Sequence, residues 1–365
     1  MKLIELHILQ SFPVSCLNRD DLGAPKSATF GGVTRARISS QCLKRAIRLH
    51  AKELCPELFA GERSKLIVHP IADAAQKHGA PREKADELSK KFCDELATFD
   101  EKALKDKGIL KVKTLMFLSP RERDEIGQEL ARILGESKDA KSLDKKIKSA
   151  AAKVQEAKLK DAADIALFGR MVATDQSLTV EGAAMFSHAL STHRADNDID
   201  FYTAVDDRQA EDPTIGEEDR AGSGMMGTLE FTSGVYYRYV GLNLGMLWDK
   251  DHLEALASED RRRVVDAFLR ASIVAVPGAR KNSMNAHTLP SFVLGLVKEK
   301  AQPLQLINAF EKPVSSKNGL IDASVAALGE HHEQSKKTWG IQPVLEIAVP
   351  DRPLDEFCSE MLAHV

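Results

Sequence analysis

The chain has 365 residues and a formal net charge of −3, from 51 basic and 54 acidic residues. With 43% hydrophobic and 29% charged residues, its composition is that of a folded, soluble protein rather than a disordered one. The small net charge excludes a globally basic coat for nucleic acid, so any nucleic-acid site must be a local patch.

Cysteine usage and hydropathy narrow the class of protein further. The five cysteines are odd in number and include no CxxC pair, which argues against a disulfide framework and a zinc knuckle. No apolar run is long enough to span a bilayer, and Glu5 and His7 interrupt the apolar run at the N-terminus. We therefore expect a cytoplasmic protein with no membrane partner and no bound cofactor.

The first fifty residues predict two strands followed by a helix. Residues 2–10 are β-rich and predict a largely buried strand, and residues 34–38 alternate like a shorter strand after a long polar loop. Ser39 or Ser40 is a suitable N-cap for a helix over residues 41–54.

Residues 56–168 differ in composition from the rest of the chain. They are rich in Ala, Leu, Lys and Glu, with few β-branched residues. Helical spacing runs through residues 72–99 and 120–168, with breaks near Gly108 and before Pro120. This segment is predicted to be a helical insertion.

Strand signals return from residue 199. They are clearest over residues 231–244 and again over 291–297, and the segment 249–276 between them has the pattern of an amphipathic helix. Residues 203–228 have no periodicity and predict a long loop, which inside a compact domain is usually functional or disordered. Strands separated by helices, with the insertion looped out, predict an α+β fold.

The small net charge hides three charged segments. Residues 1–50 carry eight basic and three acidic side chains, and residues 136–160 carry eight lysines and four acids. Residues 196–220 carry ten acids and two basic side chains. The sequence therefore predicts two basic patches and one acidic patch.

The basic N-terminal patch is centred on the predicted helix. Lys44 and Arg48 are one helical turn apart and share a face, and Arg35 and Arg37 share a face of the preceding strand. The amides at the helix start, with Gln41 beside them, favour a phosphate group. This arrangement suits a phosphodiester backbone. The plain alternative is a solvated basic helix face.

Short blocks along the chain occur in an order that is typical of one family. They include SCLNRDD (15–21), FGG (30–32), RISSQ (37–41), LKRA (43–46), GRM (169–171), FTSGVYYRY (231–239), VPGA (276–279) and NAFEK (308–312). From about residue 3 to about residue 320 the set resembles CasC, the repeated backbone subunit of the type I-E CRISPR Cascade complex. The helical insertion and the last fifty or so residues match poorly.

The resemblance implies a fold and a function. It implies an RNA-recognition-motif-like (ferredoxin-like) palm from residues 1–55 and 169–365, a helical fingers subdomain over 56–168, and a thumb loop at about 203–228. It also implies that several copies stack head to tail along one CRISPR RNA beside other Cascade subunits. The assembly would present the guide for pairing with target DNA in antiviral defence, without catalysis by this chain.

The resemblance also implies contacts with guide RNA. On the matching positions, the guide phosphates would be contacted by Arg19, Lys26, Ser39, Gln41, Lys44 and Arg48. Met171 and the thumb-stem residues Phe201, Tyr202 and Thr203 would lie at the kinked RNA, where this chain has Phe-Tyr in place of the family's Trp-Phe. The plain alternatives are a core methionine and a hydrophobic hinge that anchors the loop.

A second basic feature lies in the insertion. Four lysines at spacing i, i+3, i+7 and i+10 form one face of a predicted helix: Lys138, Lys141, Lys145 and Lys148. A lysine face without aromatic residues suits sequence-independent contact with duplex phosphates, and the resemblance implies target DNA as the partner. The alternative is an ordinary soluble helix.

The acidic loop needs an explanation if it lies near RNA. We expect its carboxylates to face the next copy in the filament, where Arg35, Arg37 and Arg45 offer basic partners. The stretch 222–227 carries no charge, so it is expected to be the tip that approaches nucleic acid.

One catalytic alternative comes from a different class of protein. Asp196, Asp198 and Asp200 alternate, with His193 close by, so an extended backbone would direct the three carboxylates to one side. Such a set could hold a divalent metal in a metal-dependent ribonuclease. Acids beside a loop more commonly cap, pair with arginines or stay solvated. His332 has no further ligand at metal-site spacing and is expected at the surface.

Overall fold

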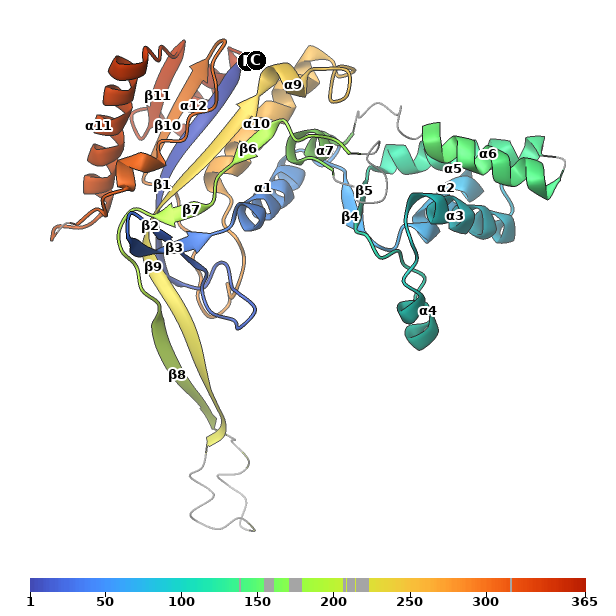
Figure 1. Ribbon diagram of the computed structural model, residues 1–365, viewed down its shortest axis with the longest axis horizontal. Helices are drawn as coiled ribbons and strands as arrows, with labels where there is room; N and C mark the ends of the chain where they lie inside the picture. Colours follow the sequence, from blue (N-terminus) through green and yellow to red (C-terminus); the bar gives the residue numbers. More distant parts are fainter. Residues whose placement is uncertain are drawn as a thin grey trace.

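The computed structural model describes residues 1–137, 139–153, 161–170, 179–205, 208, 214, 223–315 and 317–365. Three parts are visible in Figure 1: a body of helices packed on an antiparallel sheet, a helical insertion at one side, and a long two-stranded ribbon that projects away from the sheet. Among the described residues, no helix combines the length and the hydrophobicity needed to cross a bilayer.

The body contains the sheet and the helices that cover it. Its first elements are β1 (Leu3–Ser15), β2 (Ser27–Phe30), β3 (Val33–Ile38), α1 (Ser40–Leu54), α7 (Ala163–Phe168), β6 (Ala184–Phe186), β7 (Ala189–Ser191), β8 (Asp198–Val205) and β9 (Ser223–Asn243). They are followed by α9 (Leu244–Leu247), α10 (Ser258–Val274), β10 (Phe292–Lys298), the 3-10 helix η3 (Ile307–Phe310), α11 (Ile321–Trp339), β11 (Leu345–Val349) and α12 (Leu354–Leu362). The chain is therefore a mixed α/β protein.

The sheet has the strand order β11-β10-β1-β9-β7-β3-β2, and β6 and β8 pair with β9 beside this path. Its pairs are all antiparallel in the described part of the chain. β1 lies at the centre and is buried continuously over its first eight residues, because helices cover both faces. The three polar residues within that stretch are paired: His7 lies 2.8 Å from the Tyr237 hydroxyl, Glu5 accepts a 2.8 Å hydrogen bond from Tyr239, and Gln10 donates to the Thr288 carbonyl at 2.6 Å.

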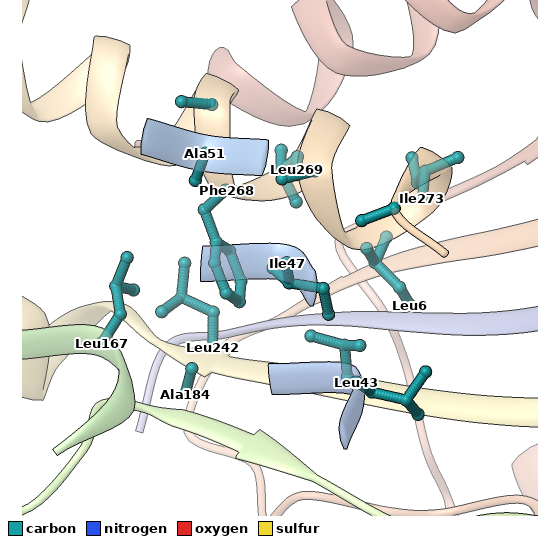
Figure 2. Packing of buried hydrophobic residues seen from close by; sticks show 14 of the residues in the cluster. Leu6, Leu43, Ile47, Ala51, Leu167, Ala184, Leu242, Phe268, Leu269 and Ile273 are labelled. Carbon is teal, nitrogen blue, oxygen red and sulfur yellow. The ribbon is translucent and has the colours of Figure 1, made fainter. Parts of the chain in front are cut away.

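Two apolar layers hold the sheet. On one face, α1 and α10 pack on β1 and β9, and Figure 2 shows Leu43 and Ile47 of α1 beside Leu6 of β1 and Phe268 of α10. On the other face, η3 and α11 cover Leu9 and other side chains of the central strands. Both faces of the central sheet are therefore occupied by the chain itself.

The insertion has a hydrophobic core of its own. Its elements are β4 (Glu62–Ser64), α2 (Val68–Lys77), α3 (Arg82–Leu96), α4 (Glu101–Lys107), β5 (Met116–Leu118), α5 (Pro120–Glu136) and α6 (Ala140–Lys153). Helices α2, α3, α5 and α6 bury one cluster between them. α2 and α5 approach closely at Gly127, where an added Cβ would lie 2.5 Å from the Ala74 Cβ. The small sheet β4–β5 lies where the insertion meets the body.

Several element boundaries differ from those that the sequence predicts. β1 continues to Ser15, and β2 lies inside the predicted polar loop, because both find pairing partners in distant strands. The predicted helix over 249–276 begins only at Ser258, and the segment 120–168 contains α5, α6 and α7 as separate helices. α7 packs into the body core, although it closes the predicted insertion.

The largest difference concerns the predicted loop over 203–228. Its ends form the ribbon, in which β8 pairs with the first half of β9 from Asp198↔Phe231 to Val205↔Ser223. The expectation that 222–227 is the tip is therefore wrong for residues 223–227, because their backbone groups pair with β8. The acids expected in the loop at 206–207 and 211–219 lie outside the described residues.

Candidate nucleic-acid interface

Helix α1 positions the basic side chains that the sequence singles out. Ser39 is the N-cap, and its Oγ accepts a 3.3 Å hydrogen bond from the Cys42 amide. The apolar positions of the helix are buried against the body, and Lys44 and Arg48 lie on the partly exposed flank beside that buried face. The cap and the buried face together fix where these two cations point.

A cavity of about 660 Å³ opens beside this helix. Its described lining comes from α1, from the small sheet of the insertion and from the segments around α7: Gln41, Lys44, Arg45, Arg48, Arg63, Leu115, Phe117, Phe168, Gly169, Arg170, Thr179, Val180 and Gly182. Five of these side chains are cationic and none is acidic. The cavity therefore suits an anion and disfavours a cation.

Aromatic rings hold three of the cations in place. The Arg63 guanidinium carbon lies 4.6 Å and the Arg48 guanidinium carbon 5.3 Å from the centre of the Phe117 ring. The Lys44 Nζ lies 5.3 Å from the centre of the Phe186 ring. These distances are within the range of cation–π attraction, so the charges are oriented without being neutralised.

When no ligand is bound, burial and nearby positive charges destabilise the charged forms of Arg63 and Lys44. Burial, and after it the positive charge of Arg48, lowers the pKa of Arg63. Burial, and after it the charge of Arg63, lowers the pKa of Lys44. In the described part of the chain, neither Lys44 nor Arg63 has an ion-pair partner. A polyanion entering the cavity would relieve this repulsion.

A buried carboxyl group lies behind Arg48. Asp164 Oδ2 is 3.7 Å from the Arg48 Nη1, and Asp164 Oδ1 accepts hydrogen bonds from the amides of Gly61 (3.3 Å) and Ile165 (3.1 Å). Burial raises the pKa of Asp164 to about 6, and the nearby Arg48 opposes that rise. Asp164 therefore orients Arg48 and joins the insertion, through Gly61, to α7.

Two further residues expected at the guide RNA lie near the start of α1. Lys26 is half-buried. Its carbonyl accepts a hydrogen bond from the Arg37 amide (2.8 Å), and its amide donates to the Asn18 carbonyl (2.9 Å). The Asn18 side chain in turn accepts a hydrogen bond from the Ser39 amide. Arg19 is exposed in the adjoining turn. The structure thus groups Lys26, Ser39 and Gln41 at one end of α1, with Arg19 nearby and Lys44 and Arg48 along the helix.

The helix N-terminus is less open than the sequence suggests. The Ser39 amide donates to Asn18 Oδ1 at 2.8 Å, and the Ser40 amide donates to His188 Nδ1 at 2.9 Å. The Cys42 amide donates to Ser39 Oγ. Most orphan donors of the first turn are therefore satisfied within the protein, and an anion here would be recognised mainly by side chains.

Arg35 does not belong to the exposed basic surface. Its side chain is fully buried and donates hydrogen bonds to the carbonyls of Ser191 (3.1 Å) and Phe310 (2.8 Å). The expectation that it pairs with acids of another copy is wrong, because its guanidinium is already used to tie β3 to η3. Arg37 remains partly exposed and Arg45 is exposed.

The ribbon presents aromatic residues on both of its faces. Phe201 is opposite Thr228 and Tyr202 is opposite Gly227, and consecutive strand residues point to opposite faces. Phe201 and Thr203 therefore share one face, and Tyr202 lies on the other. Tyr202 lies across Gly227, where an added Cβ would be 2.5 Å from its hydroxyl oxygen. Phe201 is 62% exposed, which a hinge anchored in the core would not be.

Met171 lies outside the described residues. The two residues before it, Gly169 and Arg170, line the cavity. Arg170 is buried, and its Nη1 donates to Glu122 Oε1 at 2.7 Å, so its charge is compensated.

The lysine face of the insertion is found in part. Lys141, Lys145 and Lys148 lie on α6 and are exposed. Lys148 Nζ is 3.6 Å from Glu95 Oε1, a loose surface ion pair. Lys138 lies outside the described residues, two positions before α6 begins.

The carboxylates of the ribonuclease alternative do not gather into a site. Asp198 and Asp200 are exposed on β8, and Asp196 instead pairs with Arg194 at 3.1 Å. Both ring nitrogens of His193 have partners, since Nδ1 lies 2.7 Å from the Arg194 carbonyl and Nε2 accepts from the Val235 amide at 3.2 Å.

In the described part of the chain, one group of His, Cys, Asp or Glu has ligand atoms close enough to share a metal ion: His332, Glu333 and Glu346. His332 is buried, contrary to the surface position expected for it, because α11 packs on the sheet. The Lys336 ammonium already lies 2.6 Å from Glu333 Oε1 and 3.0 Å from Glu346 Oε2. A lysine between the two carboxylates supplies the positive charge that a metal would bring.

Comparisons with known proteins agree with this architecture. The family model Cas_CT1975, described as CT1975-like protein, matches residues 4–359. A chain of a solved "CRISPR RNA-guided surveillance complex, pre-nicking" is 27% identical, with a TM-score of 0.76 and 99% of each chain covered. A chain of another "CRISPR RNA-guided surveillance complex" shares the fold, with 22% identity, a TM-score of 0.66 and full coverage of both chains. No curated protein matches the chain.

Proposed function

The chain belongs to the CT1975-like protein family, and from this premise we propose that it is a guide-RNA-binding subunit of a CRISPR surveillance complex in antiviral defence. The 27% identical chain of a solved CRISPR RNA-guided surveillance complex, similar over nearly its whole length, supports this role. The observation that carries the RNA-binding part is the cavity beside α1, where five cations converge without an acidic residue in the described lining.

The body supports an RNA-recognition-motif-like palm. With the elements between them left out, β1, α1, β6/β7, β9, α10 and β10 occur in the order β-α-β-β-α-β, with both helices on one face of the sheet. In an RNA recognition motif the open sheet face stacks bases. Here η3 and α11 cover that face, so RNA is expected at the α1 edge instead. The palm and the fingers, divided at residues 56 and 168, remain a prediction.

The ribbon and the helical insertion suit contacts with guide bases and with target DNA. The ribbon is proposed as the thumb, and its exposed Phe201 and Tyr202 as the side chains that meet guide bases. The exposed lysines of α6 are proposed to meet phosphates of target DNA. We propose that copies of the chain stack head to tail along the guide, as in a type I-E Cascade, since such heterologous contacts propagate as an open helix.

The role we propose is structural rather than catalytic. Sequence specificity then comes from base pairing of the guide, and the protein holds the guide backbone in a shape that favours pairing. A metal-dependent ribonuclease is not favoured, because Asp198 and Asp200 stand exposed on the ribbon and Asp196 pairs with an arginine.

The salt dependence of RNA binding tests the proposed interface. Lys44→Ala combined with Arg48→Ala removes two cations from the cavity, and each lost phosphate contact reduces the slope of log Kobs against log salt by about 0.7 for a single strand. We expect the negative slope to become shallower by about 1.4, with no change in base preference. The matched control is Lys105→Ala with Lys107→Ala, two exposed lysines of α4, which should keep the wild-type slope. An unchanged slope in a folded Lys44/Arg48 variant would remove this cavity from the RNA site.

A second experiment separates the two classes of function. The purified chain, assembled on labelled RNA, is incubated with Mg²⁺ or Mn²⁺, with and without Asp198→Ala and Asp200→Ala. We expect intact RNA in every case. Metal-dependent cleavage that disappears in the double variant would overturn the non-catalytic role.

A further inference from the structure

We propose that Arg63, on strand β4 of the helical insertion, is a further ligand of the guide-RNA backbone, held in place by the Phe117 ring of β5. The insertion would then contact the guide RNA together with the body, in addition to the contact with target DNA proposed for its lysines. This inference rests on the proposed function of the same cavity and adds to it a residue that the sequence patterns do not single out.

The pairing of β4 with β5 aims Arg63 at the cavity. Arg63 and Phe117 are directly opposite in the register of the two strands, so their side chains share one face of the small sheet. The Arg63 guanidinium lies 4.6 Å from the Phe117 ring centre, and both side chains line the cavity. Arg48 reaches the same ring from α1 at 5.3 Å. One aromatic platform therefore carries a guanidinium from the insertion and another from the body.

The backbone before Arg63 is fitted closely to its surroundings. At Gly61, an added Cβ would lie 2.5 Å from Asp164 Oδ1 and 2.6 Å from the Phe117 Cε2. Only a residue without a side chain lets the chain pass between these groups, and the Gly61 amide then donates to Asp164. The start of β4 is therefore tied to α7 at the same carboxyl group that faces Arg48.

The arginines near the cavity differ in whether a carboxylate already pairs with their charge. Arg170 is paired with Glu122 at 2.7 Å, and Arg123 is paired with Glu62, the neighbour of Arg63 on β4, at 2.8 Å. Arg63 has no carboxylate partner in the described part of the chain and is solvent-accessible. An oriented, uncompensated guanidinium that lines the same cavity as Lys44 and Arg48 is the arrangement expected for a phosphodiester ligand.

The test is binding of single-stranded RNA by the full chain over a range of salt concentrations. Arg63→Gln should make the negative slope of log Kobs against log salt shallower by about 0.7, the value for one phosphate contact on a single strand. The matched control is Arg132→Gln, which removes the same charge from an exposed arginine of α5 that is already paired with Glu129 and Glu136. The control should keep the wild-type slope.

Arg63→Lys separates the stacked guanidinium from charge alone. Lysine keeps the cation but cannot stack its head on the Phe117 ring or bind a phosphate in a bidentate way, so we expect the wild-type slope with several-fold weaker binding. Wild-type affinity in Arg63→Lys would overturn the part assigned to Phe117. This variant also serves if Arg63→Gln fails to fold.

The outcomes distinguish this inference from the function on which it rests. If Arg63→Gln keeps the wild-type slope while the Lys44/Arg48 variant loses slope, the cavity binds RNA and Arg63 is not a ligand. If the wild-type chain shows no salt-dependent RNA binding, the proposed function fails and the inference fails with it. A slope that falls in Arg63→Gln and stays in Arg132→Gln supports the inference.

Discussion

Replacing Asp164 by asparagine should remove a specific pH dependence of stability. Burial raises the pKa of this carboxyl from its ordinary value of 3.8 to about 6 in the folded chain. Between these two values the folded state binds the proton more tightly than the unfolded state does. The contribution of Asp164 to stability is therefore present below pH 4 and is lost as the pH rises through 6.

The size of the effect follows from the two pKa values. A difference of about 2 units corresponds to about 3 kcal/mol of unfolding free energy, at 1.36 kcal/mol per unit. Asparagine has a similar shape, can still accept from the Gly61 amide, and carries no charge at any pH in this range. The stability of the wild type relative to Asp164→Asn should therefore fall by about 2 kcal/mol between pH 4 and pH 7, because part of the total is already lost below pH 4.

Urea unfolding of both proteins, at steps from pH 4 to pH 7, gives this difference directly. Asp100→Asn is a control of opposite sign, because the Ala103 amide, which donates to Asp100, lowers the pKa of that exposed carboxyl. There the wild type should gain stability relative to the variant as the pH rises. A pH-independent difference for Asp164→Asn would refute the raised pKa of the buried carboxyl group behind Arg48.

Three more perturbations address other parts of the molecule. Charge removal on α6, as Lys141→Gln, Lys145→Gln and Lys148→Gln together, should leave assembly with guide RNA intact and weaken target-DNA binding most at low salt; failed assembly would contradict the assignment. Gly31→Ala should destabilise the chain by more than about 2 kcal/mol in urea unfolding, because its Cβ would overlap the Glu311 carbonyl in addition to the strain of φ +59°. Gly32→Ala, with φ +75° and open space around it, is the control and should lose only the strain of about 1–2 kcal/mol. Replacing residues 206–222 by an Asn-Gly turn should leave a folded chain that no longer protects guide RNA at regular intervals from nuclease; retained periodic protection would contradict the thumb assignment.

Local patterns in the sequence were enough to predict several elements of this protein. The helix α1 begins after Ser39, as its N-cap chemistry indicates, and its apolar spacing identifies the buried face and so the neighbouring flank that carries the partly exposed Lys44 and Arg48. The β-rich run over residues 231–244 lies almost wholly in β9. Caps, helical periodicity and charge clusters act between residues close in the chain, which is why they can be recognised without a structure.

The tertiary structure decided what those patterns do together. Pairing with β8 made strand out of residues 223–227, and the hydrogen bonds of the body removed Arg35 from the basic surface. Arg63 has no signature in the sequence, because its role arises only where β4 meets Phe117 and α1. Such contacts join segments far apart in the chain, and their free energy depends on packing and on shared burial, which no local pattern records.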